Sequence, residues 1–414
     1  MNSTSSKRRN ASAALAACAA ALIWFTAPAR AQETLRPEVG KPLQAAQDLI
    51  KGGRYKEALG KVREAEAAGA RNANETYLIE RMRLAAASGA GDAETAARSF
   101  EAISGSPRVP GPEKLRMIES IAGSFYRSQQ YAKSMQWSQR YFREGGSSGA
   151  IRTMLIQSQY LSGDFAGAAK ELMVEVQGAE RSGAAPAEDR LKLLLNAASK
   201  QGDNNAYVYA MEKLVTYYPK KEYWVDLLNR MQRKSGFSDR LSLDTYRLSL
   251  ATGSMTAPAD FMEMAQLALQ ADLASEGKQV LDKGFANGAL ATGPQADRAR
   301  RLRVLVDKKL AEDTASRAED EKQALAAKGG DALVGLGLSQ IYSGQAAKGV
   351  QLMQQGIAKG SLKRAEDAKL HLGIGQLVAG DKGKAQATFK TVQGADGTAD
   401  LARLWALYAK RGAA

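Results

Sequence analysis

A short pattern recurs along most of this chain of 414 residues, at intervals of roughly 33 to 39 positions. A small residue is followed two positions later by an aromatic or apolar residue, and three positions after that by alanine or another small residue. Gly53-Arg54-Tyr55-Lys56-Glu57-Ala58 and Gly163-Asp164-Phe165-Ala166-Gly167-Ala168 are the clearest copies. A unit this short cannot bury an apolar face alone, so the pattern predicts units that stack on one another.

Each copy has the chemistry of a turn between two helices. Glycine ends a helix at no steric cost, and a neighbouring aspartate such as Asp164 can cap the next helix. Tyr55 and Phe165 are expected to fill the angle between the paired helices, and the small residue after each lets the backbones approach. Weaker copies start at Gly91, Gln129, Gly202, Ser235, Gly344 and Gly380.

The composition agrees with a helical fold. Alanine, leucine, lysine, glutamine and glutamate are abundant, and aromatic residues make up only 7% of the chain. Long alternating apolar and polar runs, which a sheet would need, are absent from the sequence. With 44% hydrophobic and 25% charged residues, the chain has enough apolar material for a buried core.

The fifth unit resembles a tetratricopeptide repeat. Met211, Leu214 and Pro219 match the late positions of such a repeat, and Tyr223-Trp224-Val225-Asp226-Leu227-Leu228 matches the opening of the next one. The resemblance covers most of residues 40–395, although the spacing departs from the family's 34 residues and most units lack its tryptophan and proline. It implies an all-α fold, a right-handed α-α superhelix of roughly nine helical hairpins that forms a solenoid over residues 32–395.

Some segments depart from the repeat. No copy is legible around residues 285–330, where we expect only helices at Arg298–Leu310 and Ala315–Ala327. Asp400–Lys410 is expected to be a terminal helix, within a capping segment of residues 396–414 that covers the exposed end of the array. Stretches rich in glycine, proline and serine are interpreted as loops inside one array, at residues 104–112, 145–149, 178–186, 253–258 and 288–294.

Residues 1–31 have the layout of a secretory signal peptide. Lys7, Arg8 and Arg9 form a basic start, an uncharged stretch follows over residues 11–29, and Ala29-Arg30-Ala31 predicts cleavage before Gln32. The stretch is short for a transmembrane anchor. A lipoprotein-type processing site that leaves a lipidated Cys18 is an alternative. The expected location of the mature chain is the periplasm of a Gram-negative-type cell.

Residue counts exclude several kinds of catalytic site. Cys18 is the only cysteine and His371 the only histidine, so histidine metal clusters and Ser-His-Asp triads cannot form within one chain. Gly335 and Gly337 are expected to ease helix packing rather than to bind phosphate, and His371 to be structural. We therefore expect no enzyme activity, no cofactor and no metal.

The resemblance also implies a binding surface. In tetratricopeptide proteins the first helix of each hairpin, helix A, lines the concave groove. Lys192 and Asn196 resemble the opening of the family's carboxylate clamp, although Asp226 stands where the next asparagine should be. Counting from the helix starts, the expected groove residues are Arg81, Arg116, Tyr126, Tyr160, Lys192, Asn196 and Asn229, with Arg127, Lys200 and Arg233 beside them.

The positive net charge has two interpretations. It either attracts an acidic partner, or it is spread along solvated helix faces and has no binding role. It is +14, and removal of the signal peptide, which holds four basic residues and no acidic one, lowers it to +10. After export we expect a protein or peptide partner and no nucleic acid.

The predicted function is a non-enzymatic scaffold or chaperone of the cell envelope. The alternatives are an accessory of polysaccharide or outer-membrane export that binds an acidic polymer, and a relative of lytic transglycosylases without their catalytic domain.

Overall fold

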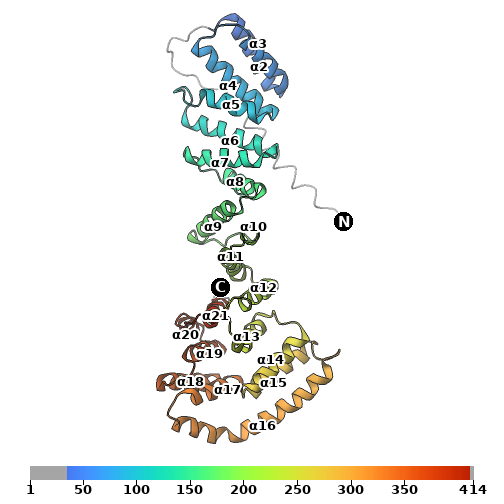
Figure 1. Ribbon diagram of the computed structural model, residues 1–414, viewed down its shortest axis with the longest axis vertical. Helices are drawn as coiled ribbons and strands as arrows, with labels where there is room; N and C mark the ends of the chain where they lie inside the picture. Colours follow the sequence, from blue (N-terminus) through green and yellow to red (C-terminus); the bar gives the residue numbers. More distant parts are fainter. Residues whose placement is uncertain (1–34, 411–414) are drawn as a thin grey trace. The chain divides into compact units, whose positions relative to one another are not determined.

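The computed structural model describes residues 35–410 as a helical protein (Figure 1). This part of the chain holds 20 α-helices, α2 to α21, one short 3-10 helix and no strand. The all-α fold class is therefore confirmed. Helices that follow one another in the chain pack in pairs such as α2/α3, α4/α5, α6/α7, α14/α15, α17/α18 and α19/α20, as expected for helical hairpins. The predicted signal peptide, residues 1–31, and Cys18 lie outside the described residues.

The helices follow one another closely in the chain. The first nine are α2 (Pro37–Lys51), α3 (Tyr55–Glu66), α4 (Ala73–Ala90), α5 (Ala93–Ile103), α6 (Gly111–Arg127), α7 (Tyr131–Arg143), α8 (Gly149–Ser162), α9 (Phe165–Arg181) and α10 (Glu188–Gln201). The next six elements are α11 (Asn204–Tyr217), α12 (Lys221–Gln232), η3 (Asp239–Leu241), α13 (Ser242–Thr252), α14 (Pro258–Gln270) and α15 (Ala274–Ala286). The last six are α16 (Ala296–Ala326), α17 (Asp331–Tyr342), α18 (Ala346–Lys359), α19 (Ala365–Val378), α20 (Lys382–Phe389) and α21 (Thr398–Lys410).

The chain divides into two compact units, whereas the sequence suggested one array. Within the described residues, the N-terminal unit comprises residues 35–178 and 197–202, and the C-terminal unit comprises residues 179–196 and 203–410. The boundary runs through α9 and α10, next to one of the predicted loop segments. Helix α9 continues through Gly178 to Arg181, so that loop is shorter than expected.

Hairpins in the N-terminal unit are built as the repeat pattern predicts. Gly163 ends α8 with a φ of 87°, a left-handed conformation that glycine adopts without strain. Tyr55, at the start of α3, packs so closely on α4 that a Cβ atom on Gly89 would lie 2.3 Å from its ring. The paired helices α2/α3, α4/α5 and α6/α7 enclose apolar side chains such as Phe100 and Phe125, which are almost fully buried.

The C-terminal unit closes on itself. Helix α21 packs against α19 and α20, and also against α11 and α13, which come much earlier in the chain (Figure 1). The contacts at this closure are partly ionic, since Lys234 Nζ lies 2.7 Å from Asp400 Oδ2 and Arg240 binds both Asp367 and Asp396. The expected terminal helix is present as α21. It has packing partners on both sides instead of capping a free end.

Helix α16 replaces the two helices that we expected at Arg298–Leu310 and Ala315–Ala327. It is continuous over 31 residues, because the intervening residues 311–314 contain no glycine or proline to interrupt it. Its first half buries Val306 in the core, whereas Val304 is 71% exposed. Most of its second half is exposed to solvent.

Candidate partner-binding surfaces

The ten predicted groove residues all lie on, or directly after, the A helices α4, α6, α8, α10 and α12. Six belong to the N-terminal unit and four to the C-terminal unit. Those in the N-terminal unit are Arg81, Arg116, Tyr126, Arg127, Tyr160 and Lys200, and those in the C-terminal unit are Lys192, Asn196, Asn229 and Arg233.

Several of these side chains are engaged in the helix stack. Arg81 donates to Glu113 across 2.6 Å, which joins α4 to α6. Tyr126 donates to Gln157 across 2.9 Å, which joins α6 to α8. Such bonds between successive A helices hold the repeat together, so these two side chains are already used by the fold. Arg127 donates to Ser124 of its own helix, and the Tyr160 ring packs edge-on against Phe165.

The lysine of the predicted carboxylate clamp already lies beside carboxylates of its own helix. Lys192 Nζ lies 3.1 Å from Glu188, which also accepts hydrogen bonds from Lys220 and Tyr223. These bonds, with Lys220 contributing most, lower the pKa of Glu188 to about 2, so Glu188 is ionised at neutral pH and neutralises Lys192. Asp226 accepts a hydrogen bond from Tyr207. A complete clamp has a free lysine and a second asparagine, whereas here Lys192 is paired with Glu188 and Asp226 stands at the position of that asparagine.

Asn229 and Arg233 line a cavity of about 730 Å³ between α11, α12 and α21 of the C-terminal unit. Both are exposed, and neither side chain has a hydrogen bond or ion pair with any residue in 35–410. Other charges at the cavity already have partners, since Lys234 binds Asp400 and the Arg230 guanidinium stacks 3.7 Å above the Tyr207 ring. Of the predicted residues in this unit, Asn229 and Arg233 are therefore the pair that can receive a partner.

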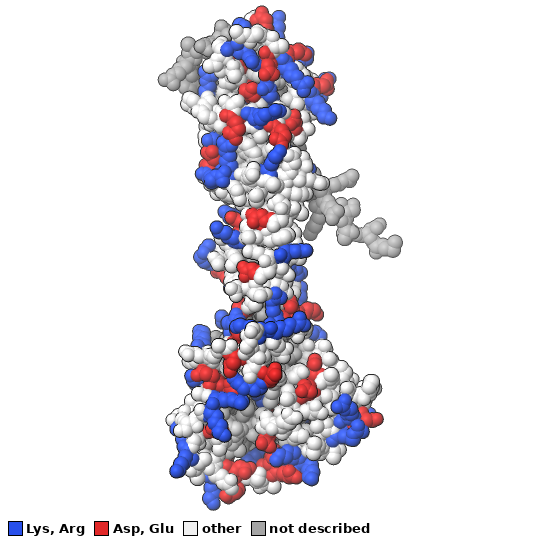
Figure 2. Space-filling model, viewed as in Figure 1, with Lys and Arg blue, Asp and Glu red and all other residues white. Residues whose placement is uncertain are grey.

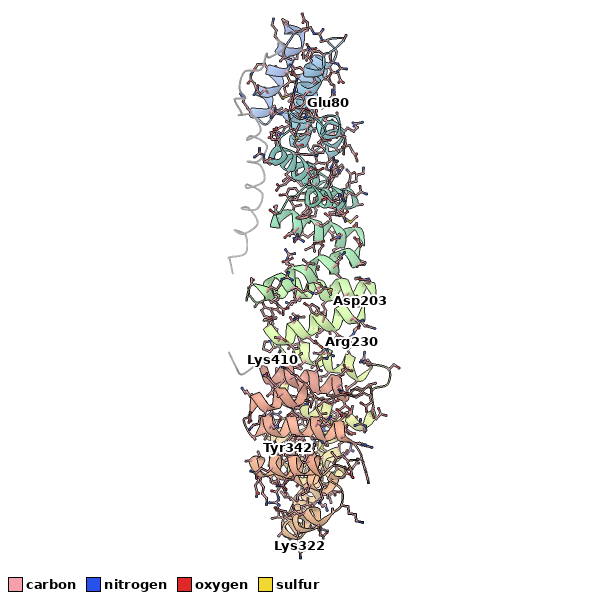
Figure 3. All side chains as sticks on the ribbon, turned by 90° about the vertical axis from the view of Figure 1, so that its left-hand side faces the viewer. Glu80, Asp203, Arg230, Lys322, Tyr342 and Lys410 are labelled. Atoms are coloured by element: carbon pink, nitrogen blue, oxygen red, sulfur yellow. The ribbon has the colours of Figure 1, made fainter. Side chains whose placement is uncertain are left out.

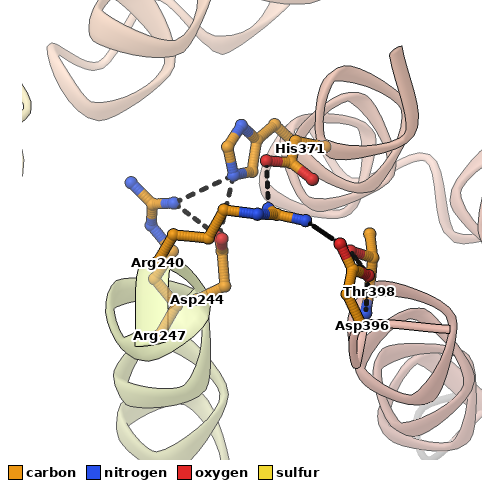
Figure 4. A network of polar contacts seen from close by, with 7 residues as sticks. Arg240, Asp244, Arg247, His371, Asp396 and Thr398 are labelled. Atoms are coloured by element: carbon orange, nitrogen blue, oxygen red, sulfur yellow. Dashed lines mark hydrogen bonds and ion pairs between the residues drawn. The ribbon is translucent and has the colours of Figure 1, made fainter. Parts of the chain in front are cut away.

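A buried ion cluster joins α13, α15 and α19 of the C-terminal unit, and Figure 4 shows its Arg247, Asp244 and His371. Arg247 of α13 donates to both oxygens of Glu276 on α15, at 2.7 and 2.6 Å, and to Asp244 at 2.6 Å. Asp244 Oδ1 in turn lies 2.9 Å from His371 Nε2 on α19. Burial alone would raise the pKa of Asp244, but the charges of His371 and Arg247 outweigh burial and hold this pKa below its usual value. His371 thus has a structural partner, as we expected.

The cluster separates two cavities. The first, of about 1000 Å³, lies at the N-terminal ends of α13, α17 and α19 and is also lined by the inner face of α16. The second, of about 380 Å³, lies at the C-terminal ends of α13, α15, α17 and α19. Arg247 lines both cavities, so its side chain forms part of the wall between them. Tyr342, labelled in Figure 3, lines the second cavity.

Sequence reasoning missed this cluster for a physical reason. The partners of Arg247 and Asp244 on other helices are 29 and 127 positions away, far outside any local pattern. An aspartate three positions before an arginine looks like an ordinary helix-surface pair in the sequence. The pair of Asp244 and Arg247 is buried only because the C-terminal unit closes around it.

Charges of both signs are interspersed on the face that Figure 2 shows. Many are paired between neighbouring helices, such as Arg152 with Glu171 and Lys213 with Glu180, both at 2.6 Å. The net positive charge is therefore not gathered into one basic strip on that face.

Two further tests concern metals and membranes. Within residues 35–410 no group of three histidine, cysteine, aspartate or glutamate side chains is arranged to hold a metal ion. None of the helices in the same part of the chain combines the length and the apolar composition that a membrane span requires.

Comparisons with known proteins add little to this geometry. No protein-family model and no curated protein matches the chain. Two solved structures share a helical arrangement with it over most of their length. Yeast Tom70 is 11% identical, with a TM-score of 0.24, over 90% of this chain and 96% of Tom70. The TPR domain of P58(IPK) is 11% identical, with a TM-score of 0.21, over 90% of this chain and 97% of the domain. At such low TM-scores the helical hairpins themselves, rather than these likenesses, establish the fold.

Proposed function

We propose that this chain is a non-enzymatic scaffold or chaperone of the bacterial cell envelope, which holds a protein partner at the cavity between α11, α12 and α21. The observation that carries the proposal is the pair Asn229 and Arg233, exposed and without side-chain partners at a cavity of about 730 Å³. Stacked hairpins also leave long surfaces free for partners, because their core lies between neighbouring repeats.

The chemistry of the cavity favours an acidic segment of the partner. A free guanidinium such as that of Arg233 can bind a carboxylate through two parallel N–H bonds. The Asn229 amide can both donate and accept, which suits a peptide backbone. Two carboxylates that line the cavity, Asp226 and Asp400, accept bonds from Tyr207 and Lys234. Neither of them occupies the Arg233 guanidinium, which stays available to an acid of the partner.

Crosslinking in intact cells tests this proposal. We expect Arg233→Glu to reduce capture of the partner about tenfold, since it places a carboxylate opposite an acidic segment. Arg143→Glu is the matched control, because Arg143 is an equally exposed arginine on α7 without a side-chain partner in the described residues. Equal capture by the two variants and the parent chain would rule out this cavity as the contact.

A second measurement separates a protein partner from an acidic polymer. The pairing of basic side chains with acidic ones on neighbouring helices favours a discrete partner, since a polyanion needs a continuous strip of unpaired basic charge. We expect acidic peptides to compete with the captured partner and a polyanionic polysaccharide not to compete at physiological salt. The opposite order would favour a role in polymer export. Turnover of purified peptidoglycan by the mature chain would contradict a non-enzymatic function.

The envelope location is tested independently. Mass spectrometry of the protein from the periplasmic fraction should find Gln32 as the first residue. Intact Met1 in the cytosolic fraction would contradict export and leave the scaffold proposal to be judged by crosslinking alone. A lipid-modified Cys18 would instead indicate a membrane-anchored form.

A further inference from the structure

The smaller cavity beside the ion cluster has mostly apolar walls and two buried charged residues. It measures about 380 Å³ and is enclosed by helices of the C-terminal unit only. Its sides are mostly apolar and include the nearly buried Trp405 of α21. We call it the Trp405 cavity. Its apolar and aromatic lining is Leu250, Ala251, Met264, Val280, Tyr342, Ile374, Leu377, Val378, Trp405 and Tyr408.

The floor of the Trp405 cavity is charged. Arg247 and Glu276 line it although they are only 4% and 1% exposed. A buried ion pair of this kind is rarely worth more to stability than well-packed apolar side chains of the same volume. Its position at the end of an otherwise apolar cavity is therefore better explained by recognition of a ligand than by a contribution to stability.

The N–H groups of Arg247 that lack an acceptor determine which ligand groups the floor of the cavity can bind. A guanidinium has five N–H groups. Arg247 directs Nε and Nη2 toward Glu276 and Nη1 toward Asp244, with His371 Nε2 3.3 Å from Nη1, and one N–H on Nη2 has no partner among the described residues. Two carboxylates already face this one guanidinium. The floor can thus donate one bond to a neutral oxygen, but it disfavours a further anion.

The mouth of the Trp405 cavity, in contrast to its floor, favours an anion. Lys283 lines the cavity and is exposed, and its only polar contact in the described residues is a long one, 3.4 Å to the backbone oxygen of Leu250. Val378, also on the lining, is 53% exposed. An acidic group on a bound molecule would therefore be stabilised at the mouth, where Lys283 has no carboxylate to neutralise it.

We propose that the Trp405 cavity binds a small organic anion with an aromatic or alkyl body. The body lies among Leu377, Ile374 and Trp405, and a neutral acceptor at the inner end meets Arg247. The acidic group stays at the mouth beside Lys283. A volume of about 380 Å³ falls within the range of small-molecule sites. This site is separate from the α11, α12 and α21 cavity and does not depend on the partner proposed there.

Two fluorescent probes with the same aromatic body test the proposal. One is 8-anilinonaphthalene-1-sulfonate, and the other is N-phenyl-1-naphthylamine, which lacks the sulfonate. We expect the full chain to bind both at one site, the sulfonate more tightly. Lys283→Gln should weaken the sulfonate about three- to fivefold, as for an exposed ion pair, and leave the amine unchanged. Val378→Asp should weaken both probes about tenfold or more, because it places a charge against the apolar body.

Matched controls separate this site from general adhesion to the surface. Val304→Asp and Lys308→Gln change an exposed valine and an exposed lysine of α16, and neither should alter the affinity for either probe. Thermal unfolding must show that all four variants remain folded. Unchanged probe affinity in Val378→Asp, or equal losses in Val378→Asp and Val304→Asp, would overturn the site. An equal effect of Lys283→Gln on both probes would overturn the assignment of an anion.

Discussion

Oδ1 of Asp244 lies 2.9 Å from Nε2 of His371, a residue 127 positions later in the chain. The same carboxylate accepts a bond from Arg247, which reaches on to Glu276. One cluster thereby connects α13, α15 and α19. Buried charges that must satisfy one another therefore lie beside the apolar core that α13 to α19 share.

The first prediction concerns this cluster. Arg247→Met should lower the free energy of unfolding of the C-terminal unit by about 3–5 kcal/mol, because Glu276 would remain buried without its partner. The double variant Arg247→Met with Glu276→Leu should recover most of that loss, since Glu276 no longer leaves an unpaired charge and Asp244 keeps His371 as its partner. Urea unfolding followed by circular dichroism measures both. A double variant that is less stable than the single one would contradict this account.

A second prediction distinguishes two glycines of α17. The sequence suggested that Gly335 and Gly337 both ease helix packing, but only Gly337 faces a neighbouring backbone. A Cβ atom there would lie 2.6 Å from the carbonyl oxygen of Gly349, whereas a Cβ atom on Gly335 meets nothing within 4 Å. Gly337→Ala should therefore cost about 1–3 kcal/mol through overpacking.

Gly335→Ala is the matched control. It should stabilise the helix by about 0.5–1 kcal/mol, because alanine loses less backbone freedom on folding. Urea midpoints of the two variants should therefore move in opposite directions. Midpoints that shift together would show that the close approach of α17 and α18 does not constrain the chain.

Features within one repeat could be predicted from the sequence because their causes are local. The turn at Gly163 and the aromatic side chain of Tyr55 act on helices that are near in the chain, so the same pattern returns in each copy. The pair of Glu188 and Lys192 is local too. A glutamate four positions before a lysine is a common helix pair, so this pairing could have been predicted from the sequence, where we instead expected Lys192 to open a clamp.

Closure of the C-terminal unit could not be predicted in this way. Arg240 binds Asp396 across 156 positions, and nothing in the neighbourhood of either residue marks the other. The continuous α16 was missed for a different reason. The repeat pattern disappears there, and we divided the segment into two helices although residues 311–314 contain no glycine or proline to interrupt one.

The third prediction tests the closure. Arg240 binds Asp367 and Asp396 and also donates to Thr398 Oγ1 across 3.2 Å, with its side chain 23% exposed. Arg240→Ala should cost about 1–2 kcal/mol, between the values for exposed and buried pairs. Amides of α21 should then exchange with solvent roughly tenfold faster, since 1.4 kcal/mol is a factor of ten.

Arg298→Ala is the control, because Arg298 is an exposed arginine of α16 without a side-chain partner in residues 35–410. It should leave exchange in α21 unchanged. Equal rates in both variants would show that Arg240 does not hold α21.

The fourth prediction concerns acid stability of the N-terminal unit. Glu75 is buried, its side chain only 1% exposed, and its two oxygens accept bonds of 2.9 Å from Arg36. The bonds from Arg36 contribute most and outweigh the effect of burial, so that the pKa of Glu75 falls from 4.5 to about 2. Because the folded pKa lies below the unfolded value, the unfolded chain takes up the proton first as the pH falls. The stabilisation is therefore fully present above about pH 4.5 and is lost as the pH falls to about 2.

Glu75→Gln removes this dependence. The variant should unfold at a lower temperature than the parent chain at pH 7, and the difference should shrink steadily between pH 4.5 and pH 2. Thermal unfolding followed by circular dichroism at pH 7, 4.5, 3 and 2 measures it. Glu64→Gln, which removes an exposed glutamate paired with Lys61 on α3, is the control and should unfold close to the parent chain at pH 7. A gap between Glu75→Gln and the parent chain that stays constant from pH 7 to pH 2 would mean that Glu75 stabilises the unit through its shape and not through its charge.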